Sequence, residues 1–167
     1  MAEDLKRLFS EIMEGNKQKI LRICFVYASN KEDQKDLFQE VALNIWKSLP
    51  SFRHQASVDT WVYRVCLNIA IQYALKRNKT RRNLVDIEGI IISDERADAE
   101  TVIENIERIK MLRSCISKLE GSEKALVLLF LEDFSYRSIS EVTGISENHV
   151  AVKLKRIKLK LFNCVNN

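Results

Sequence analysis

The sequence predicts an all-α protein made of two small helical bundles joined by a linker, the second containing a helix-turn-helix. Three observations lead to this prediction. The 167 residues include only 4 Gly and 1 Pro, too few for the frequent turns of sandwiches and barrels. Apolar residues recur at three- and four-residue steps, as in amphipathic helices. A hydrophobic fraction of 46% and a charged fraction of 30% are typical of a folded chain.

The first bundle begins with one helix or two over residues 3–28, with a break expected at Gly15 and Asn16. Asn30 is the expected N-cap of the next helix. Pro50 is expected to end that helix, because the residue before a proline is disfavoured in the helical region.

A third helix is expected after the polar loop 51–56, with Ser57 as its cap. Its apolar face comprises Val58, Trp61, Val62, Val65, Cys66, Ile69 and Tyr73. Its opposite face carries Arg64, Asn68, Gln72 and Lys76, and leads into the basic run 76–82.

Residues 83–97 are acidic and lack a helical period, which indicates a linker. A helical stripe then returns at Val102, Ile103, Ile106, Ile109, Leu112, Ile116 and Leu119. Gly121 is expected to end that helix and Ser122 to cap the next. The apolar run 125–131 is expected to be the central helix of the second bundle.

The last forty residues indicate a helix-turn-helix. A short helix over 135–142 should turn Tyr136, Ile139 and Val142 inward, and Gly144 provides the turn. Ser146 is the expected cap of the final helix, which buries Val150, Leu154, Ile157 and Leu161. Its outer face bears Asn148, His149, Val152, Lys153, Lys155, Arg156 and Lys160. Amide, imidazole and cationic groups at the start of such a helix suit base edges and flanking phosphates.

The net charge of +4 is unevenly distributed. Residues 76–82 and 148–167 each contain five basic and no acidic residues, whereas residues 83–107 contain eight acidic and one basic. Two basic patches attract phosphate. The alternative is that both are solvated helix ends, since lysines near a helix C-terminus are favourable on dipole grounds alone.

Other classes of function find little support in the sequence. Four cysteines without a CxxC pair suggest buried, reduced thiols in a cytoplasmic protein. Two distant histidines disfavour a metal site, and no cofactor is expected. No apolar run is long enough to insert into a membrane, and the start does not resemble a signal peptide. No phosphate loop or catalytic constellation indicates an enzyme.

Two stretches resemble a known family. Residues 36–82 are similar to region 2 of bacterial extracytoplasmic-function (ECF) sigma factors. They share its Asp-x-x-Gln-Glu run, the downstream tryptophan, the loop after Pro50 and the closing basic run. Residues 119–161 are similar to region 4, with Phe134-Ser135-Tyr136 and Gly144-Ile145-Ser146 in register. The resemblance covers nearly the whole chain and implies units at 1–82 and 98–167 joined by the linker 83–97.

The resemblance implies a subunit that binds core RNA polymerase, through the β′ clamp helices and the β flap, and directs it to promoter DNA. Asp36, Gln39 and Glu40 would contact polymerase. The −10 element would be read by Phe52, Arg53, His54, Arg64, Asn68, Gln72, Lys76 and Arg77. The −35 element would be read by Asn148, His149, Val152, Lys153, Arg156 and Lys160. Phe52 or Tyr63 either stacks on a base or packs in the fold.

An anti-sigma factor is an expected partner, and we expect the two domains to pack together only in an inhibited state. The chain departs from the family at Gln72, where an acid is usual, and at Glu120, where a proline is usual. His149 and Lys153 replace a threonine and an arginine, which affects the promoter sequence rather than the role. The alternatives are a helix-turn-helix regulator that is not a polymerase subunit, a helical adaptor, and a helical enzyme.

Overall fold

A computed structural model describes the backbone of residues 2–78 and 99–167, and the side chains of residues 3–77 and 107–167. Every regular element in those ranges is a helix, which confirms the predicted fold class. The predicted linker, residues 83–97, lies outside the described residues, as does the end of the first basic run.

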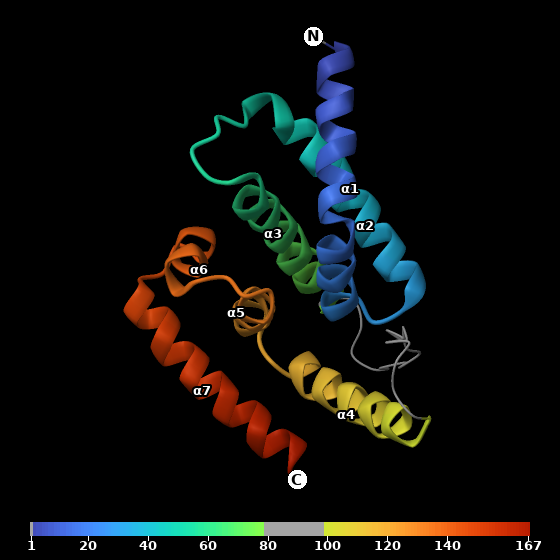
Figure 1. Ribbon diagram of the computed structural model, residues 1–167, viewed down its shortest axis with the longest axis vertical. Coiled ribbons are helices and arrows are strands. Elements are labelled where there is room, and N and C mark those ends of the chain that lie inside the picture. Colours follow the sequence, from blue (N-terminus) through green and yellow to red (C-terminus); the bar gives the residue numbers. More distant parts are fainter. Residues whose placement is uncertain (1, 79–98) are drawn as a thin grey trace.

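The first bundle consists of α1 (Ala2–Tyr27), α2 (Lys31–Ser48) and α3 (Val58–Asn78), which pack side by side (Figure 1). Its fully buried side chains include Ile20, Ile23, Leu37, Val41, Ile45 and Cys66. The break expected at Gly15 and Asn16 is wrong, because α1 continues through both. Asn16 is buried, and its side-chain amide donates to the Ile12 carbonyl 3.0 Å away, one turn back. Its side-chain nitrogen is thereby bonded within the helix, whereas its buried Oδ1 has no hydrogen-bond partner among the described residues.

The predicted helix starts in this bundle are confirmed. The Asn30 side chain accepts a hydrogen bond from the Asp33 amide at 2.9 Å, and Ser57 accepts one from the Thr60 amide at 3.1 Å. After α2, Leu49–Ser51 forms one 3-10 turn, η1, that contains Pro50. The chain therefore leaves the α-helical path at the predicted proline.

The second bundle consists of α4 (Ala99–Ser117), α5 (Gly121–Leu131), α6 (Tyr136–Thr143) and α7 (Glu147–Val165). Residues 125–129 of α5 are buried, as expected of a central helix. Ser122 is not its cap: α5 begins at Gly121, and the Glu123 side chain accepts from the Glu120 amide at 3.3 Å. In the described part of the stripe predicted for α4, Ile109 and Leu112 are exposed and Ile116 is buried. The side chains of residues 102–106 lie outside the described residues.

The helix-turn-helix is formed by α6 and α7. Gly144 has φ +76° in the left-handed region, where a side chain would be strained. Ser146 caps α7 by accepting from the His149 amide at 3.3 Å. Ile139, Val150 and Leu154 are buried as predicted, but Tyr136 is exposed. Its position at the start of α6 leaves its ring at the surface.

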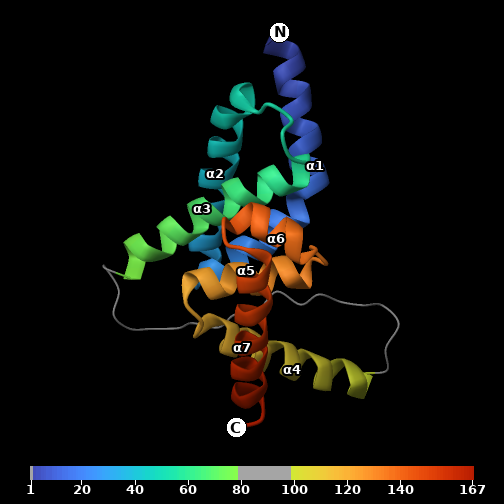
Figure 2. The same ribbon diagram turned by 90° about the vertical axis from the view of Figure 1, so that its left-hand side faces the viewer.

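The two bundles share one continuous hydrophobic core. Figures 1 and 2 place α6 against α3, and α5 between α3 and α7. The amino-terminal part of α1 and the carboxyl end of α7 point to opposite ends of the molecule. The packing of α1 and α3 against α4, α5 and α6 is called the closed arrangement below.

Candidate nucleic-acid interface

The exposed surface at the start of α7 carries most of the predicted −35 residues. Asn148, His149, Val152 and Arg156 are all exposed, and the Ser146 cap fixes where the helix begins. Lys160 lies farther along, and its ammonium is 2.6 Å from a carboxylate oxygen of Glu123 on α5. The outer face of the start of α7 is therefore exposed, whereas Lys160 is paired within its own bundle.

A second polar surface runs along α3. Arg64, Asn68, Gln72 and Lys76 are exposed at four-residue steps, which places them on one face of the helix. Arg77 behaves differently, because it forms an ion pair with the buried Asp33 and donates to the Tyr73 hydroxyl at 2.6 Å. The structure thus brings four of the predicted −10 residues together and places Arg77 in contacts within the first bundle.

The loop before α3 presents aromatic and basic side chains. The Phe52 ring contacts those of His54 and Trp61, with centroids 4.5 and 4.7 Å away. Arg53 and His54 are exposed, whereas Phe52 is half-buried. Tyr63 is 1% exposed and its ring centroid is 4.8 Å from that of Phe134. Tyr63 therefore packs in the fold, and Phe52 remains the aromatic candidate for stacking on a base.

The predicted polymerase contacts lie on the outer face of α2. Asp36 and Gln39 are exposed and Glu40 is half-buried. Leu43, which the sequence reasoning missed, is 50% exposed one turn beyond Gln39. It falls outside the apolar stripe of its helix, and that mismatch was the available signal. Asp36, Gln39, Glu40 and Leu43 are called the α2 face below.

The closed arrangement brings together residues from the two surfaces that the sequence predicts to read DNA. Arg64 and Asn68 of α3 and Lys153 of α7 line one cavity between the bundles. Arg64 also donates to the backbone carbonyl of Glu141 in α6. This proximity was not predicted, because sequence periodicity carries no information on how one bundle docks on the other.

Three further polar contacts join α1 to the second bundle. The Tyr27 hydroxyl donates to the Gly121 carbonyl at 2.6 Å, and Arg22 forms an ion pair with Glu132. Arg113 of α4 donates to the Phe25 carbonyl at 3.2 Å. Burial raises the pKa of Tyr27, so its hydroxyl remains a donor at ordinary pH. The docked bundles therefore meet through specific hydrogen bonds as well as apolar packing.

Comparison with known families accounts for both bundles. The sigma-70 region 2 model matches residues 12–80, and the sigma-70 region 4 model matches residues 109–161. The chain belongs to the sigma-70 family. The sigma factor SigV of Bacillus subtilis is 28% identical over 162 residues, covering 92% of each chain. The ECF sigma-E factor of Haemophilus influenzae is 25% identical over 170 residues, covering 95% of this chain and 87% of that protein. These relatives identify the chain as an ECF sigma factor.

Solved structures share the fold of this sigma factor. The sigma factor RpoE of Bartonella quintana, solved with the anti-sigma factor NepR, aligns with a TM-score of 0.73 at 13% identity, over 98% of both chains. CnrH, solved with the cytosolic domain of CnrY, aligns with a TM-score of 0.69 at 16% identity, over 96% of this chain and 89% of that chain.

The cysteines of the sigma factor differ from the prediction of four reduced thiols. Cys115 of α4 and Cys164 of α7 form a disulfide, with their Cα atoms 5.9 Å apart. Cys24 and Cys66 are free and buried in the first bundle, as predicted. Burial raises the pKa of Cys24 to about 12. The sequence could not reveal the pairing, because 49 positions separate the bonded cysteines.

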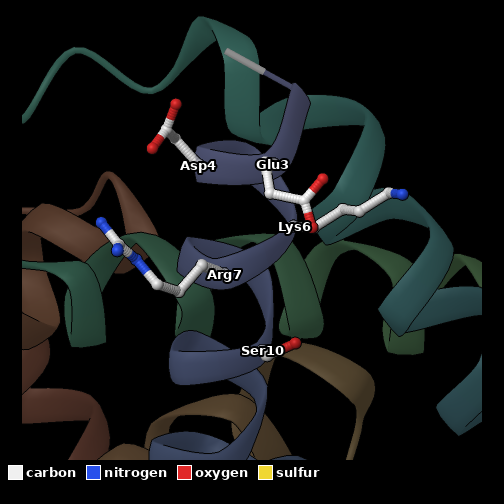
Figure 3. A pocket seen from close by; sticks show the side chains of 5 residues that line it. All are labelled: Glu3, Asp4, Lys6, Arg7 and Ser10. Carbon is white, nitrogen blue, oxygen red and sulfur yellow. The ribbon is translucent and has the colours of Figure 1, made fainter.

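Other surfaces of the sigma factor offer less. A shallow depression is lined by Glu3, Asp4, Lys6, Arg7 and Ser10, all of which project from α1 (Figure 3). A single helix face of this kind makes no enclosed site. Within residues 2–78 and 99–167, no cluster of side chains has the composition of a metal site. No helix in the described part of the chain is long and apolar enough to cross a membrane.

Proposed function

We propose that this sigma factor binds core RNA polymerase, recognises −35 and −10 promoter elements and assists promoter opening. The observation that carries the proposal is the presence on one chain of both sigma regions, each with an exposed polar helix face. A regulator that is not a polymerase subunit would need only the second. The factor acts by binding rather than by catalysis, and it works in the cytoplasm with the unit boundaries 1–82, 83–97 and 98–167.

The −35 element is read by the first turns of α7 in this proposal. Asn148 and His149 are exposed at the start of the helix, and Arg156 lies two turns later. A helix of this kind reaches base edges in the major groove with its first residues. Lys153 contributes a single point charge, because an ammonium cannot form the two-pronged contact of a guanidinium. Lys160 contributes only after leaving Glu123.

The −10 element is read by α3 and the loop before it. Recognition of a base outside the stack requires a pocket or a stacking surface, and Phe52 with its neighbours offers one. Arg53, His54, Arg64, Asn68, Gln72 and Lys76 follow the separated strand. Arg77 supports this surface by holding Asp33 and Tyr73 in place.

The α2 face binds the β′ clamp helices. Its three polar residues lie in the two turns that precede an exposed apolar side chain, Leu43, and protein interfaces commonly combine apolar and polar contacts of this kind.

The closed arrangement is a resting state in this proposal. Arg64, Asn68 and Lys153 line a cavity between the bundles, so promoter binding requires the bundles to separate. Of the two structural neighbours, RpoE was solved with the anti-sigma factor NepR and CnrH with the cytosolic domain of CnrY. A comparable anti-sigma partner is therefore proposed to hold this chain closed, and polymerase to open it.

Run-off transcription with core polymerase and a promoter library tests the function. We expect initiation at a subset of templates, and a changed upstream preference for Lys153→Ala and Arg156→Ala, each weakened by about 1–3 kcal/mol at its position. Lys17→Ala removes the same charge from an exposed site on α1 and should leave preference unchanged. Absence of stimulation at every template, together with DNA binding in the absence of polymerase, would support the ordinary regulator instead.

A further inference from the structure

The disulfide between Cys115 and Cys164 occupies a defined place in the second bundle. It joins the carboxyl-terminal half of α4 to the last turn of α7. Its Cα–Cα separation of 5.9 Å lies in the range where two cysteines bond without backbone movement. The loop that it closes contains all of α5 and α6 and nearly all of α7. The disulfide thus ties α4 to the carboxyl end of the helix-turn-helix.

This cysteine pair is more accessible than the other two cysteines. Cys164 is partly exposed in the last turn of α7, whereas Cys115 is 4% exposed. Cys24 and Cys66 have no exposed area, and burial raises the pKa of both thiols. A small thiol or peroxide can therefore reach Cys164, whereas Cys24 and Cys66 are shielded. Of the four cysteines, only the pair in the second bundle is therefore open to small redox reagents.

The disulfide is also close to the contact that holds α4 on the first bundle. Arg113, two residues before Cys115, donates to the Phe25 carbonyl at 3.2 Å, and its guanidinium carbon lies 3.2 Å from the centre of the Phe25 ring. The last turn of α1 has no basic residue of its own, so Arg113 supplies the cation that a helix C-terminus favours. One end of α4 is therefore bonded covalently to α7 and bound through Arg113 to α1.

We propose that Cys115 and Cys164 form a reversible thiol–disulfide site, and that the oxidised form holds the closed arrangement more tightly than the reduced form. The inference rests on the proposed function, which places the chain in a compartment where thiols are kept reduced. Disulfides there are usually transient and often redox-sensing.

The chemistry balances with common small reagents. Hydrogen peroxide oxidises the Cys164 thiolate to a sulfenic acid, with a hydroxide leaving group that takes a proton and departs as water. Attack by the Cys115 sulfur then forms the S–S bond and releases a second water. Two equivalents of a low-molecular-weight thiol reverse the reaction: the first forms a mixed disulfide, the second releases it, and one small-molecule disulfide is produced.

The effect on closure follows from preorganisation. In the oxidised chain, α4 and α7 move together, so Arg113 and the α6 contacts meet the first bundle as parts of one rigid surface. In the reduced chain, α4 must be ordered against α7 at the same time as the bundles dock. A surface ordered in advance docks more tightly, because less conformational entropy is lost.

The test compares the full chain after treatment with hydrogen peroxide and after reduction. Mass spectrometry of alkylated peptides reports the Cys115–Cys164 bond, and labelling of Arg64 with phenylglyoxal reports closure, because Arg64 donates to the Glu141 carbonyl only when closed. Arg53, exposed on the loop before α3, is the internal control. We expect Arg64 to be labelled several-fold more slowly in the oxidised chain, with Arg53 unchanged.

The variant Cys115→Ser/Cys164→Ser should label at the rate of the reduced wild type and show no response to peroxide. Failure to form the linked peptide, or equal labelling of Arg64 in both redox states, would overturn the proposal. Run-off transcription with this variant and core polymerase tests the proposed function separately. Stimulation by the variant would show that the function stands even if the redox site does not.

Discussion

Replacing Tyr27 by phenylalanine tests the closed arrangement through a single hydrogen bond. The Tyr27 hydroxyl donates to the Gly121 carbonyl at 2.6 Å, and the side chain is 8% exposed. Removing the donor costs about 1–3 kcal/mol when the acceptor is left unsatisfied. Gly121 is only half-buried, so water can reach its carbonyl and the expected cost is at the lower end of this range. A loss of about 1 kcal/mol raises the opening constant roughly fivefold.

The gain should appear in binding of free chain to promoter DNA. A protein whose binding-competent state is rarely populated has its apparent affinity reduced by that population. Tyr27→Phe should therefore bind a duplex containing the upstream element about fivefold more tightly without polymerase, as measured by fluorescence anisotropy at fixed salt. In complex with core polymerase, which is proposed to separate the bundles, its affinity should equal that of the wild type.

Tyr73→Phe is the matched control. The Tyr73 hydroxyl donates to the Asp33 carbonyl at 3.4 Å, entirely within the first bundle, so its loss should not change opening. Equal affinities of free wild type and Tyr27→Phe for the duplex would refute the claim that closure limits DNA binding. An equal gain from Tyr73→Phe would show that the effect is general loosening rather than release of the second bundle.

Three other predictions use different properties of the chain. Gly144→Ala places a side chain at φ +76° and should lower the stability of the second bundle by about 1–2 kcal/mol in thermal unfolding. The control Gly15→Ala, in open space on α1, should be neutral or stabilising. A larger loss of stability from Gly15→Ala than from Gly144→Ala would contradict the turn geometry. Leu43→Ser should weaken binding to core polymerase in a pull-down without changing the melting temperature, whereas Leu75→Ser, at a 60% exposed position on α3, should bind normally; equal binding by both would exclude Leu43 from the interface. Burial raises the pKa of the Cys24 thiol from 9.0 to about 12, so the stability that it contributes is fully present below pH 9 and is lost as pH rises toward 12. Denaturant unfolding at pH 8 and pH 11 measures this loss. The free energy of unfolding should fall less between the two pH values in Cys24→Ala than in the wild type.

The local signals in the sequence predicted the elements well. Asn30, Ser57 and Ser146 were recognised as caps because each needs only a side-chain oxygen and an amide three residues away. Gly144 was recognised because the left-handed region favours glycine. These features depend on a few neighbouring residues, so a single sequence suffices to predict them.

The failures came where distant contacts decide. Asn16 did not break α1, because burial and a bond to the preceding turn kept it helical. The disulfide depends on how α4 packs on α7, and the cavity shared by Arg64 and Lys153 depends on docking of the two bundles. Among the candidate site residues, exposure followed the helical period. The helical period could not predict the ion pairs of Arg77 with Asp33 and of Lys160 with Glu123, because each partner lies on another helix.

Two roles fall on the same residues of helix α3, and this overlap constrains how the protein can evolve. Its outer residues Arg64 and Asn68 belong both to the proposed promoter contact and to the lining between the bundles. A mutation at either residue therefore changes the closed arrangement and the proposed promoter contact together. Selection for variants with unprompted activity should consequently also recover variants with shifted promoter choice, and the two traits should be hard to separate by single substitutions on this helix.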